Sequence, residues 1–257
     1  MAEAMFPKGA CLVFGGSGGI GRAVALGMAE AGSDIGIVYR SKRDAAEAAA
    51  ADIERLGRRA TVHVVDVRIA EQVQFVIDSA IADHGRLHTI IWAAGPVVDQ
   101  RFLADVTQEQ WKLAVDVELH GFFNVVQATL PHLRSQGGGS YVTLGSAGHL
   151  RWPDRDVLSV APKGTNEQIV RALAREEGRF EVRANSILVG VIEAGMFREL
   201  TERGELDPQW AEDTRKMLAL KRWGRAADIA NAAVFLASDK AAYVTGQQLA
   251  VAGGFQL

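Results

Sequence analysis

The sequence predicts an α/β fold in which one parallel β-sheet is covered by helices on both of its faces. Short apolar runs alternate with longer segments of helical periodicity along the chain, which is typical of right-handed βαβ units. A glycine-rich turn joins the first apolar run to the first helix within residues 11–21. Residues 87–93, L-H-T-I-I-W-A, form a mostly apolar run, as expected for a strand buried on both faces. We therefore expect a doubly wound sheet.

The glycine-rich turn reads C-L-V-F-G-G-S-G-G-I-G. Gly15, Gly19 and Gly21 allow positive φ and let a large anion come close to the backbone. The helix that begins near Gly19 offers free N–H groups and a positive dipole end, which suit a pyrophosphate. The spacing differs from the commonest dinucleotide fingerprint, G-x-G-x-x-G, although Gly16, Gly19 and Gly21 fit that frame loosely. A tight turn with only a structural role is the alternative at this point.

The other elements follow in order along the chain. Strands are expected at residues 12–14, 35–39, 61–65, 87–93, 140–144, 182–189 and 248–251. Helices are expected from near residue 19, at 44–56, 71–83, 108–134 and 160–177, and in several segments between 196 and 238. Asp44 is the expected N-cap of the second helix, because its side chain can accept a bond from a first-turn N–H.

Length and composition fit one domain over residues 1–257, or two small ones, and no linker divides the chain. Hydrophobic residues make up 48% and charged residues 23%, which supplies a large core. The net charge of −3 speaks against nucleic acid, and no apolar run reaches the ~18 residues of a membrane span. The single cysteine, Cys11, excludes disulfides. Without a signal-peptide pattern, we expect a cytoplasmic protein, and no metal site is predicted.

Ligands of such sheets bind outside the carboxyl ends of the strands. Several short motifs lie at or near these ends or along the later helices, and they fall in a fixed order. They are G-G-S-G-G-I-G (15–21), D-V (66–67), A-A-G (93–95), S-A-G (146–148), K-G (163–164), R-A-N-S (183–186), G-R-A-A-D-I-A (224–230), F-L-A-S-D (235–239), T-G-Q (245–247) and G-G (253–254). Together they resemble the short-chain dehydrogenase/reductase family, of the compact single-domain type with a Rossmann-like fold, over essentially the whole chain.

The resemblance implies a nicotinamide dinucleotide site. The positions that match the family's cofactor contacts are Gly15, Ser17, Gly19, Ile20, Gly21, Asp66, Val67, Ala93, Ala94, Gly95, Lys163, Gly190 and Ile192. The end of the second strand carries Arg40 and Ser41 where an acidic residue would bind the ribose 2′-hydroxyl of NAD. Arg40 and Ser41 can bind a 2′-phosphate instead, and Lys42 or Arg43 adds charge, so NADP(H) is the expected cofactor. A solvated basic loop is the alternative.

The catalytic positions depart from the family's pattern. Ser146 matches the family's serine and Lys163 its lysine, but Ser159 stands at the tyrosine position and Glu118 at the asparagine position. Val189 and Ala194 also replace residues that the family usually has there, a proline and a threonine. A serine hydroxyl is a much weaker acid than a phenol, and it reaches about 4 Å less far. The active site is therefore atypical.

Ser159 has three readings. It is an N-cap of the helix at 160–177, a catalytic hydroxyl, or the nucleophile of a Ser-x-x-x-Lys pair. Glu118 is expected to pair with Lys163, either as a proton relay or as a structural salt bridge. Further acid candidates near the crevice are His120, His149, Asp154 and Asp156.

A helix-rich segment at about 193–223 is expected to form a lid over a small hydrophobic substrate, as the resemblance implies. Its apolar residues are Met196, Phe197, Leu200, Trp210, Met217, Leu218 and Trp223, and Trp152 lies on a facing loop. The lid residues have an alternative role in packing the lid helices together.

Three functions fit these observations. The first is an NADP(H)-dependent oxidoreductase acting on a carbonyl or an activated double bond, with Ser146 polarising the oxygen and Lys163, aided by Glu118 or water, moving the proton. The others are a non-redox enzyme (a lyase, isomerase or cyclase) and a catalytically silent partner subunit.

A homotetramer or homodimer is expected from apolar faces that resemble the pairing faces of the family's tetramers. These faces carry Phe122, Phe123, Val126, Ile169 and Leu173. The alternative is that the same faces are buried within one protomer.

Overall fold

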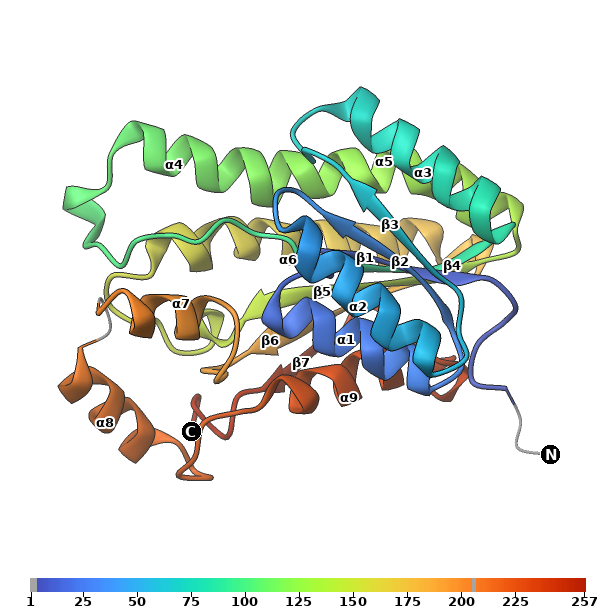
Figure 1. The fold of residues 1–257 in the computed structure, drawn as a ribbon. Helices are drawn as coiled ribbons and strands as arrows, with labels where there is room; N and C mark the ends of the chain where they lie inside the picture. Colours follow the sequence, from blue (N-terminus) through green and yellow to red (C-terminus); the bar gives the residue numbers. More distant parts are fainter. Residues whose placement is uncertain (1–3, 205–206) are drawn as a thin grey trace.

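A seven-stranded, all-parallel sheet forms the centre of the computed structural model, which describes residues 4–204 and 207–257 (Figure 1). The strand order is β3-β2-β1-β4-β5-β6-β7, so the direction of winding reverses between β1 and β4. The strands are β1 (Ala10–Phe14), β2 (Asp34–Tyr39), β3 (Ala60–Val64), β4 (Leu87–Trp92), β5 (Gly139–Ser146), β6 (Val182–Val189) and β7 (Gln248–Val251). This is the Rossmann-like, doubly wound single domain that the alternation of elements predicts.

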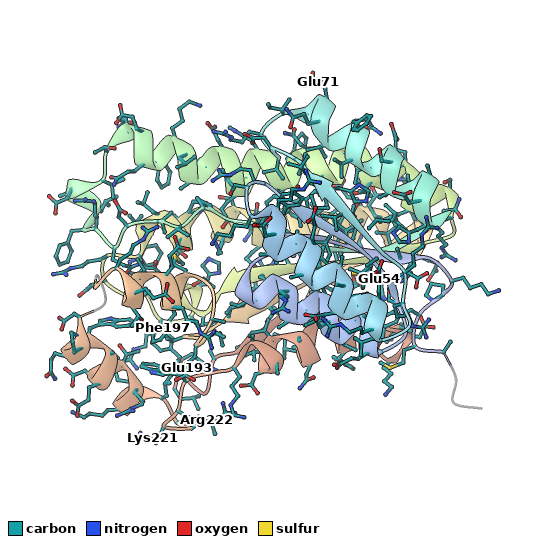
Figure 2. All side chains as sticks on the ribbon, viewed as in Figure 1. Glu54, Glu71, Glu193, Phe197, Lys221 and Arg222 are labelled. Carbon is teal, nitrogen blue, oxygen red and sulfur yellow. The ribbon has the colours of Figure 1, made fainter. Side chains whose placement is uncertain are left out.

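Helices cover both faces of the sheet, and two short helices lie beyond its carboxyl ends. The helices are α1 (Gly19–Glu30), α2 (Arg43–Arg55), α3 (Ala70–His84), α4 (Gln108–Val115), α5 (Gly121–Ser135), α6 (Val157–Glu177), α7 (Met196–Glu202), α8 (Pro208–Met217) and α9 (Ala226–Ala237). In Figure 1, α7 and α8 stand apart from the two layers, at the left. Charged side chains such as Glu54 on α2 and Glu71 on α3 point outward into solvent (Figure 2).

Two hydrophobic cores lie on the opposite faces of the sheet, and β1 contributes to both. Cys11 and Val13 pack with α1, α2 and α9, whereas Leu12 and Phe14 pack with α3, α5 and α6. Successive side chains of a strand point to opposite faces, so a strand buried on both sides is mostly apolar. β4 is buried over its whole length, and its two polar residues, His88 and Thr89, bond to one another through the His88 Nδ1 and the Thr89 Oγ1.

The helix expected at 108–134 is interrupted. Residues Asp116–His120 form a π-helical turn between α4 and α5. A π turn inserts an extra residue into a helix, and such turns are frequent at functional sites. Glu118 lies within this turn.

Two predicted helix caps are wrong. Lys42, not Asp44, is the N-cap of α2, and Asp44 lies in the first turn, where its charge still favours the helix dipole. Ser159 is not an N-cap either, because α6 begins at Val157 with Asp156 as its N-cap. The Asp156 carbonyl accepts bonds from the N–H groups of Ser159 and Val160. Burial of the first turn outweighs the local preference against helix before Pro162.

The apolar faces expected to pair between subunits are largely used within the protomer. Phe122, Val126 and Leu173 are at most 4% exposed and belong to the core under α5 and α6. Phe123 alone of the five is half exposed, and Ile169 is partly buried against the same core. The prediction that Phe122, Val126 and Leu173 contact another subunit is therefore wrong, because they are buried within the protomer. In the part of the chain that the structure describes, no helix has the length and apolarity needed to cross a bilayer.

Candidate active site

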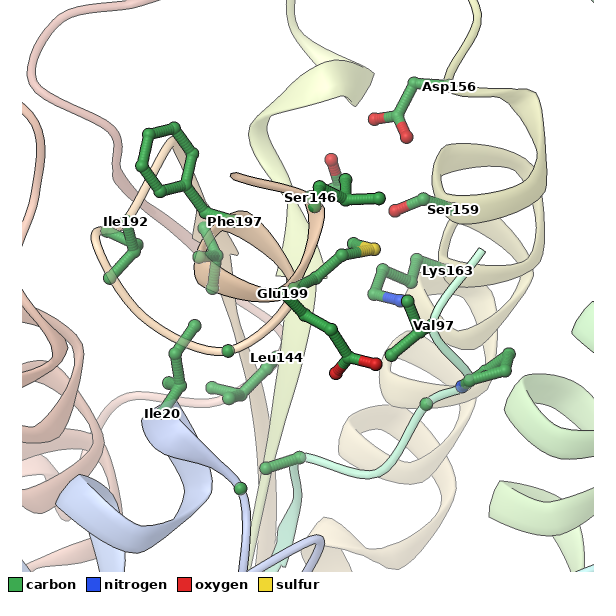
Figure 3. A pocket seen from close by; sticks show the side chains of 18 of the residues that line it. Ile20, Val97, Leu144, Ser146, Asp156, Ser159, Lys163, Ile192, Phe197 and Glu199 are labelled. Atoms are coloured by element: carbon green, nitrogen blue, oxygen red, sulfur yellow. The ribbon is translucent and has the colours of Figure 1, made fainter. Parts of the chain in front are cut away.

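A cavity of about 1000 Å³ opens at the carboxyl ends of the strands, between the glycine-rich turn and α7 and α8. Every cofactor-binding and catalytic position predicted from the sequence lies along its wall. Figure 3 shows part of this wall, with Ile20 on α1 at one end and Ser159 and Lys163 on α6 at the other. The cavity lies where parallel α/β sheets bind their ligands, because the direction of winding reverses there.

The glycine-rich turn has a backbone that only glycine fits. Gly15 has φ of 80°, and a Cβ on Gly21 would overlap the Gly15 carbonyl oxygen. A Cβ on Gly19 would lie 2.6 Å from the Gly195 nitrogen, at the start of α7. The N-cap of α1 is Gly18, and no side chain caps this helix. Its first N–H groups are therefore available for an anion, so the turn fits the pyrophosphate of a dinucleotide.

The basic residues after β2 differ in their partners. The Lys42 ammonium lies 3.6 Å from Glu199 on α7, and Arg43 donates to Glu47 over 2.7 Å. Arg40 and Ser41 are exposed and line the cavity. Among residues 4–204 and 207–257, no carboxylate lies within ion-pair distance of Arg40. Arg40 is therefore the guanidinium at this corner that can bind an anionic ligand.

Asp66 and Val67 follow β3 at the same corner. The Asp66 carboxylate accepts a bond from the Arg68 Nε over 2.8 Å, and this bond is the main reason why the pKa of Asp66 lies below its usual range. The charge of Arg40 contributes in the same direction. Asp66 therefore stays ionised and fixed in place.

Glu118 and Lys163 form an ion pair between the π turn and α6. Glu118 is 1% exposed, whereas the Lys163 side chain is 19% exposed. The indole Nε1 of Trp92 donates to the second carboxylate oxygen over 3.4 Å. Asn166 donates through Nδ2 to the Glu118 carbonyl over 3.0 Å. The predicted pairing of Glu118 with Lys163 is thus present in the structure, and it is compatible with either of its two readings.

Gly95 gives the Glu118 carboxylate its space. A Cβ on Gly95 would lie 2.5 Å from Glu118 Oε1, which is closer than real Cβ contacts. The last residue of A-A-G therefore serves the ion pair as well as the wall of the cavity.

Ser146 ends β5, and its Oγ accepts a bond from the Gly148 N–H over 3.1 Å. Its hydroxyl hydrogen remains free to donate into the cavity. Ser159 is 7% exposed and lies in the first turn of α6. In Figure 3 its hydroxyl points toward the side of the cavity where Ser146 lies. The two serines therefore face one part of the cavity.

The further acid candidates separate into two groups. His120 is exposed beside Asp116, and the His149 Nε2 donates to the Val160 carbonyl, so neither lines the cavity. Asp154 and Asp156 do line it. Burial raises the pKa of Asp156, while the Gln100 hydrogen bond and the charge of Lys163 oppose this rise.

The segment expected as a lid contributes Met196, Phe197, Leu200, Trp210 and Met217 to the cavity, and Trp152 faces them from the loop after β5. Leu218 packs instead in a small core with Phe255, and Trp223 packs on Phe197 with ring centres 5.7 Å apart. The Glu199 side chain also points into the cavity (Figure 3), which the sequence did not suggest.

Trp92 and Asn166 are further residues that the sequence analysis missed. Trp92 directly precedes A-A-G, and Asn166 lies three residues after Lys163, on the same side of the helix. Their positions beside A-A-G and Lys163 were the only features of the sequence that pointed to them.

Known proteins resemble the chain over nearly its whole length. The sequence model of the family described as enoyl-(acyl carrier protein) reductase matches residues 15–256. The 3-oxoacyl-(acyl-carrier-protein) reductase FabG of Staphylococcus epidermidis is 30% identical, over 96% of this chain and 98% of that protein. The L-rhamnose 1-dehydrogenase (NAD(P)(+)) of a Sphingomonas species is 34% identical, over 95% and 94%.

Among solved structures, the carveol dehydrogenase of Mycobacterium avium in complex with NAD is similar, with a TM-score of 0.90 and 30% identity. The alignment covers 98% of this chain and 99% of that one. The fold, the cavity and these similarities together define the class: the chain belongs to the short-chain dehydrogenase/reductase family.

Proposed function

We propose that the protein is an NADP(H)-dependent oxidoreductase that acts on a carbonyl or an activated double bond of a small hydrophobic substrate. One observation carries this proposal. A single cavity joins the glycine-rich turn, an arginine after β2 with no ion-pair partner among the described residues, a serine at the end of β5 and a lysine in the second turn of α6. The oxidoreductase names of its relatives support the same reaction class.

The residues along the cavity divide the work. The N–H groups at the start of α1 bind the pyrophosphate, and Arg40 with Ser41 binds the 2′-phosphate. When bound, the nicotinamide supplies or accepts a hydride at the substrate carbon. Ser146 donates its hydroxyl hydrogen to the substrate oxygen and polarises the C=O bond. Lys163, paired with Glu118, bonds the ribose and keeps a positive charge beside the place where negative charge develops.

The apolar side chains of α7 and α8 favour a hydrophobic substrate. Met196, Leu200 and Trp210 contribute to one wall of the cavity, with Trp152 from the loop after β5. We further propose that the protein works in the cytoplasm as a homo-oligomer.

The missing phenol favours a second candidate. With Ser159 at this position, the chain lacks the family's usual proton donor there. A non-redox enzyme on the same scaffold, or a catalytically silent partner subunit, is therefore the alternative.

Calorimetric titration tests the cofactor assignment. We expect NADP(H) to bind at least about tenfold more tightly than NAD(H), because a charged hydrogen bond to the 2′-phosphate contributes about 1–3 kcal/mol. Arg40→Ala should remove this difference and leave NAD(H) binding unchanged, with Arg43→Ala as the matched control because Arg43 already pairs with Glu47. Equal affinity of the wild type for both cofactors would contradict the assignment.

A panel of ketones and enones tests the reaction class. Consumption of NADPH by the wild-type protein with any of these compounds supports the oxidoreductase. Tight NADPH binding without consumption across the panel favours the non-redox enzyme or the silent subunit.

A further inference from the structure

Three polar side chains form one row along the start of α6. Asp156, Ser159 and Lys163 follow one another at spacings of three and four residues, which places them on one side of a helix. All three line the cavity. Figure 3 shows them one above another, with Ser146 facing them from β5. The row therefore extends the site beyond Lys163 to a carboxyl group.

The Asp156 carboxyl is held by the loop that follows β4. The Gln100 Nε2 donates to its Oδ1 over 3.2 Å. The backbone is fixed by a bridge between Arg101 and Asp156, in which the Arg101 N–H donates to the Arg155 carbonyl over 3.0 Å. No hydrogen bond to Oδ2 is found among the residues that the structure describes. One oxygen is thus anchored, and the other is left for a ligand in the cavity.

Ser159 leaves room beside this carboxyl. A phenol at residue 159 would reach about 4 Å farther than the serine hydroxyl. It would fill the part of the cavity between Asp156, Ser146 and Lys163. The short serine side chain keeps this part open, so that a substrate oxygen polarised by Ser146 can approach Asp156.

The charges around Asp156 determine its protonation. Lys163 on α6 is the charge that lowers its pKa, and burial raises the pKa by more, so the result lies above the usual range. Arg101 interacts with Asp99, and the Arg155 guanidinium lies 4.5 Å from the Phe102 ring centre. Lys112 on α4 and Asp116 in the π turn form an ion pair, so their charges neutralise one another. The remaining charged residues of the nearby loop, Arg151 and Asp154, are exposed at the cavity wall.

We propose that Asp156 is the acid that protonates the substrate oxygen during reduction, in place of the missing phenol. The inference rests on the proposed oxidoreductase function and names its proton donor. The carbonyl oxygen takes the electron pair of the C=O bond as hydride reaches the carbon, and it receives the proton from the Asp156 carboxyl. The alcohol is released, and the Asp156 carboxylate regains a proton from water.

Kinetics of three variants test this assignment on the best substrate of the ketone panel. Asp156→Asn keeps the shape of the side chain and cannot deliver the proton. We expect kcat to fall at least about a hundredfold, the size typical of a lost acid–base group, while the KM for NADPH changes less than about threefold. Asp156→Glu should retain part of the activity with a shifted pH profile. Asp105→Asn, which removes an exposed carboxylate outside the cavity, should match the wild type.

Carbon NMR of the protein labelled at its aspartate carboxyl carbons gives a readout that needs no turnover. Asp156→Asn identifies the Asp156 resonance by its disappearance. This resonance should titrate at higher pH than an ordinary aspartate carboxyl, whose pKa is about 3.9, because burial favours the neutral form. Reduction by the wild type should likewise fall as the pH rises through this titration, because the proton is then lost.

The outcomes are distinct. A wild-type protein that reduces the probe, with Asp156→Asn nearly as active, overturns the assignment of Asp156 and leaves the oxidoreductase in place. An Asp156 resonance that titrates at or below the ordinary aspartate pKa overturns it as well. If the wild-type protein never consumes NADPH, the proposed oxidoreductase function is wrong, and the assignment of Asp156 as its proton donor is wrong as well.

Discussion

Ser159 illustrates how a single residue changes the chemistry that a site can do. A serine hydroxyl has a far higher pKa than a phenol, so it is a much weaker acid. Its short side chain nevertheless opens the cavity toward Asp156, as the row along α6 shows (Figure 3). With Asp156 as the proposed proton donor, we expect the size of the residue 159 side chain to matter more than its hydroxyl.

Removing the Ser159 hydroxyl should have little effect. We expect Ser159→Ala to change turnover of a panel substrate by less than about tenfold, because the proton is supplied elsewhere. Lys163→Ala should cost at least about a hundredfold, since it removes the charge beside the reacting oxygen. Initial rates of NADPH consumption give both values. If the two variants are equally inactive, Ser159 is catalytic.

The stability of the lysine variant must be measured alongside its activity. Lys163→Ala leaves the buried carboxylate of Glu118 without its partner, and an unpaired buried charge is strongly destabilising. The double variant Glu118→Gln with Lys163→Ala serves as the control, because it removes both charges. If the double variant is folded but inactive, the lost activity reflects the missing catalytic groups and not unfolding of the protein.

Residue contacts were predictable where they follow from the strand ends. Ser146 and Gly95 lie at one cavity because the carboxyl ends of parallel strands share one edge of the sheet, and Lys163 reaches the same cavity from α6. The bonds of Trp92 and Asn166 to Glu118 were not predictable. They depend on the exact depth of the π turn, which no spacing in the sequence encodes.

At the scale of elements, the π turn is the feature that places Glu118. The Glu118 backbone carbonyl accepts a hydrogen bond from Asn166 Nδ2, so α6 supports the π turn directly. The Asn166 side chain is 2% exposed, and its Oδ1 has no hydrogen-bond partner among the described residues. The Asn166 side chain thus donates a hydrogen bond to the carbonyl of the π turn, while its own oxygen accepts none from the described residues.

Asn166→Ala should loosen the π turn. The Glu118 carbonyl would lose its partner, and an unsatisfied buried group costs about 1–3 kcal/mol. Hydrogen-exchange mass spectrometry should show faster exchange in a peptide covering residues 116–120. Asn124→Ala removes a similar bond, from Nδ2 to the Val67 carbonyl, and should destabilise the protein without this local change. Unchanged exchange in the Asn166 variant would show that the turn holds by itself.

The sequence predicted most elements well and a few of their ends badly. Strands were predictable because runs buried on both faces are mostly apolar, as in β1, where all five residues are buried and apolar. The continuous helix at 108–134 was expected because a π turn keeps nearly the helical periodicity. The start of α6 was misplaced because burial of Leu158 and Val160 overrides the local effect of Pro162.

At the scale of the whole molecule, buried histidines link stability to pH. His88 is 2% exposed, and its ring stacks on Phe6 with centres 5.4 Å apart. Burial lowers the pKa of His88 to about 4. Burial also lowers the pKa of His63, His84 and His132. At a pH between the lowered pKa of such a histidine and its ordinary pKa, the unfolded chain binds more protons than the folded chain.

Stability should therefore fall as the pH falls from 7 toward 4. His88 alone accounts for about 3 kcal/mol, from a difference of roughly 2.5 units between its unfolded and folded pKa values. Urea unfolding at several pH values gives the slope. His88→Gln should flatten it, because glutamine does not titrate. The raised pKa values of Asp156 and Glu167 act in the opposite direction. A stability that does not change between pH 7 and 5 would contradict the prediction.

Assembly is the second property of the whole molecule. We expect a homotetramer or homodimer, with Phe123 on α5 as a contact residue, because it is a large apolar residue that is 50% exposed. Light scattering at micromolar concentration should give a multiple of the 27.6 kDa chain mass. Phe123→Ser should lower that mass, while Phe75→Ser, at an exposed site on α3, should leave it unchanged. A wild-type protein of monomer mass would refute the expectation.

The unequal burial of Glu118 and Lys163 also sets the order in which mutation can change this site. Losing Lys163 first leaves a carboxylate at 1% exposure without a partner, a cost of about 3–5 kcal/mol against a total stability of about 5–15 kcal/mol. Losing Glu118 first leaves an ammonium that still reaches water. We therefore expect substitutions at this pair to be tolerated in one order, Glu118 first and Lys163 second, whether or not the lysine takes part in catalysis.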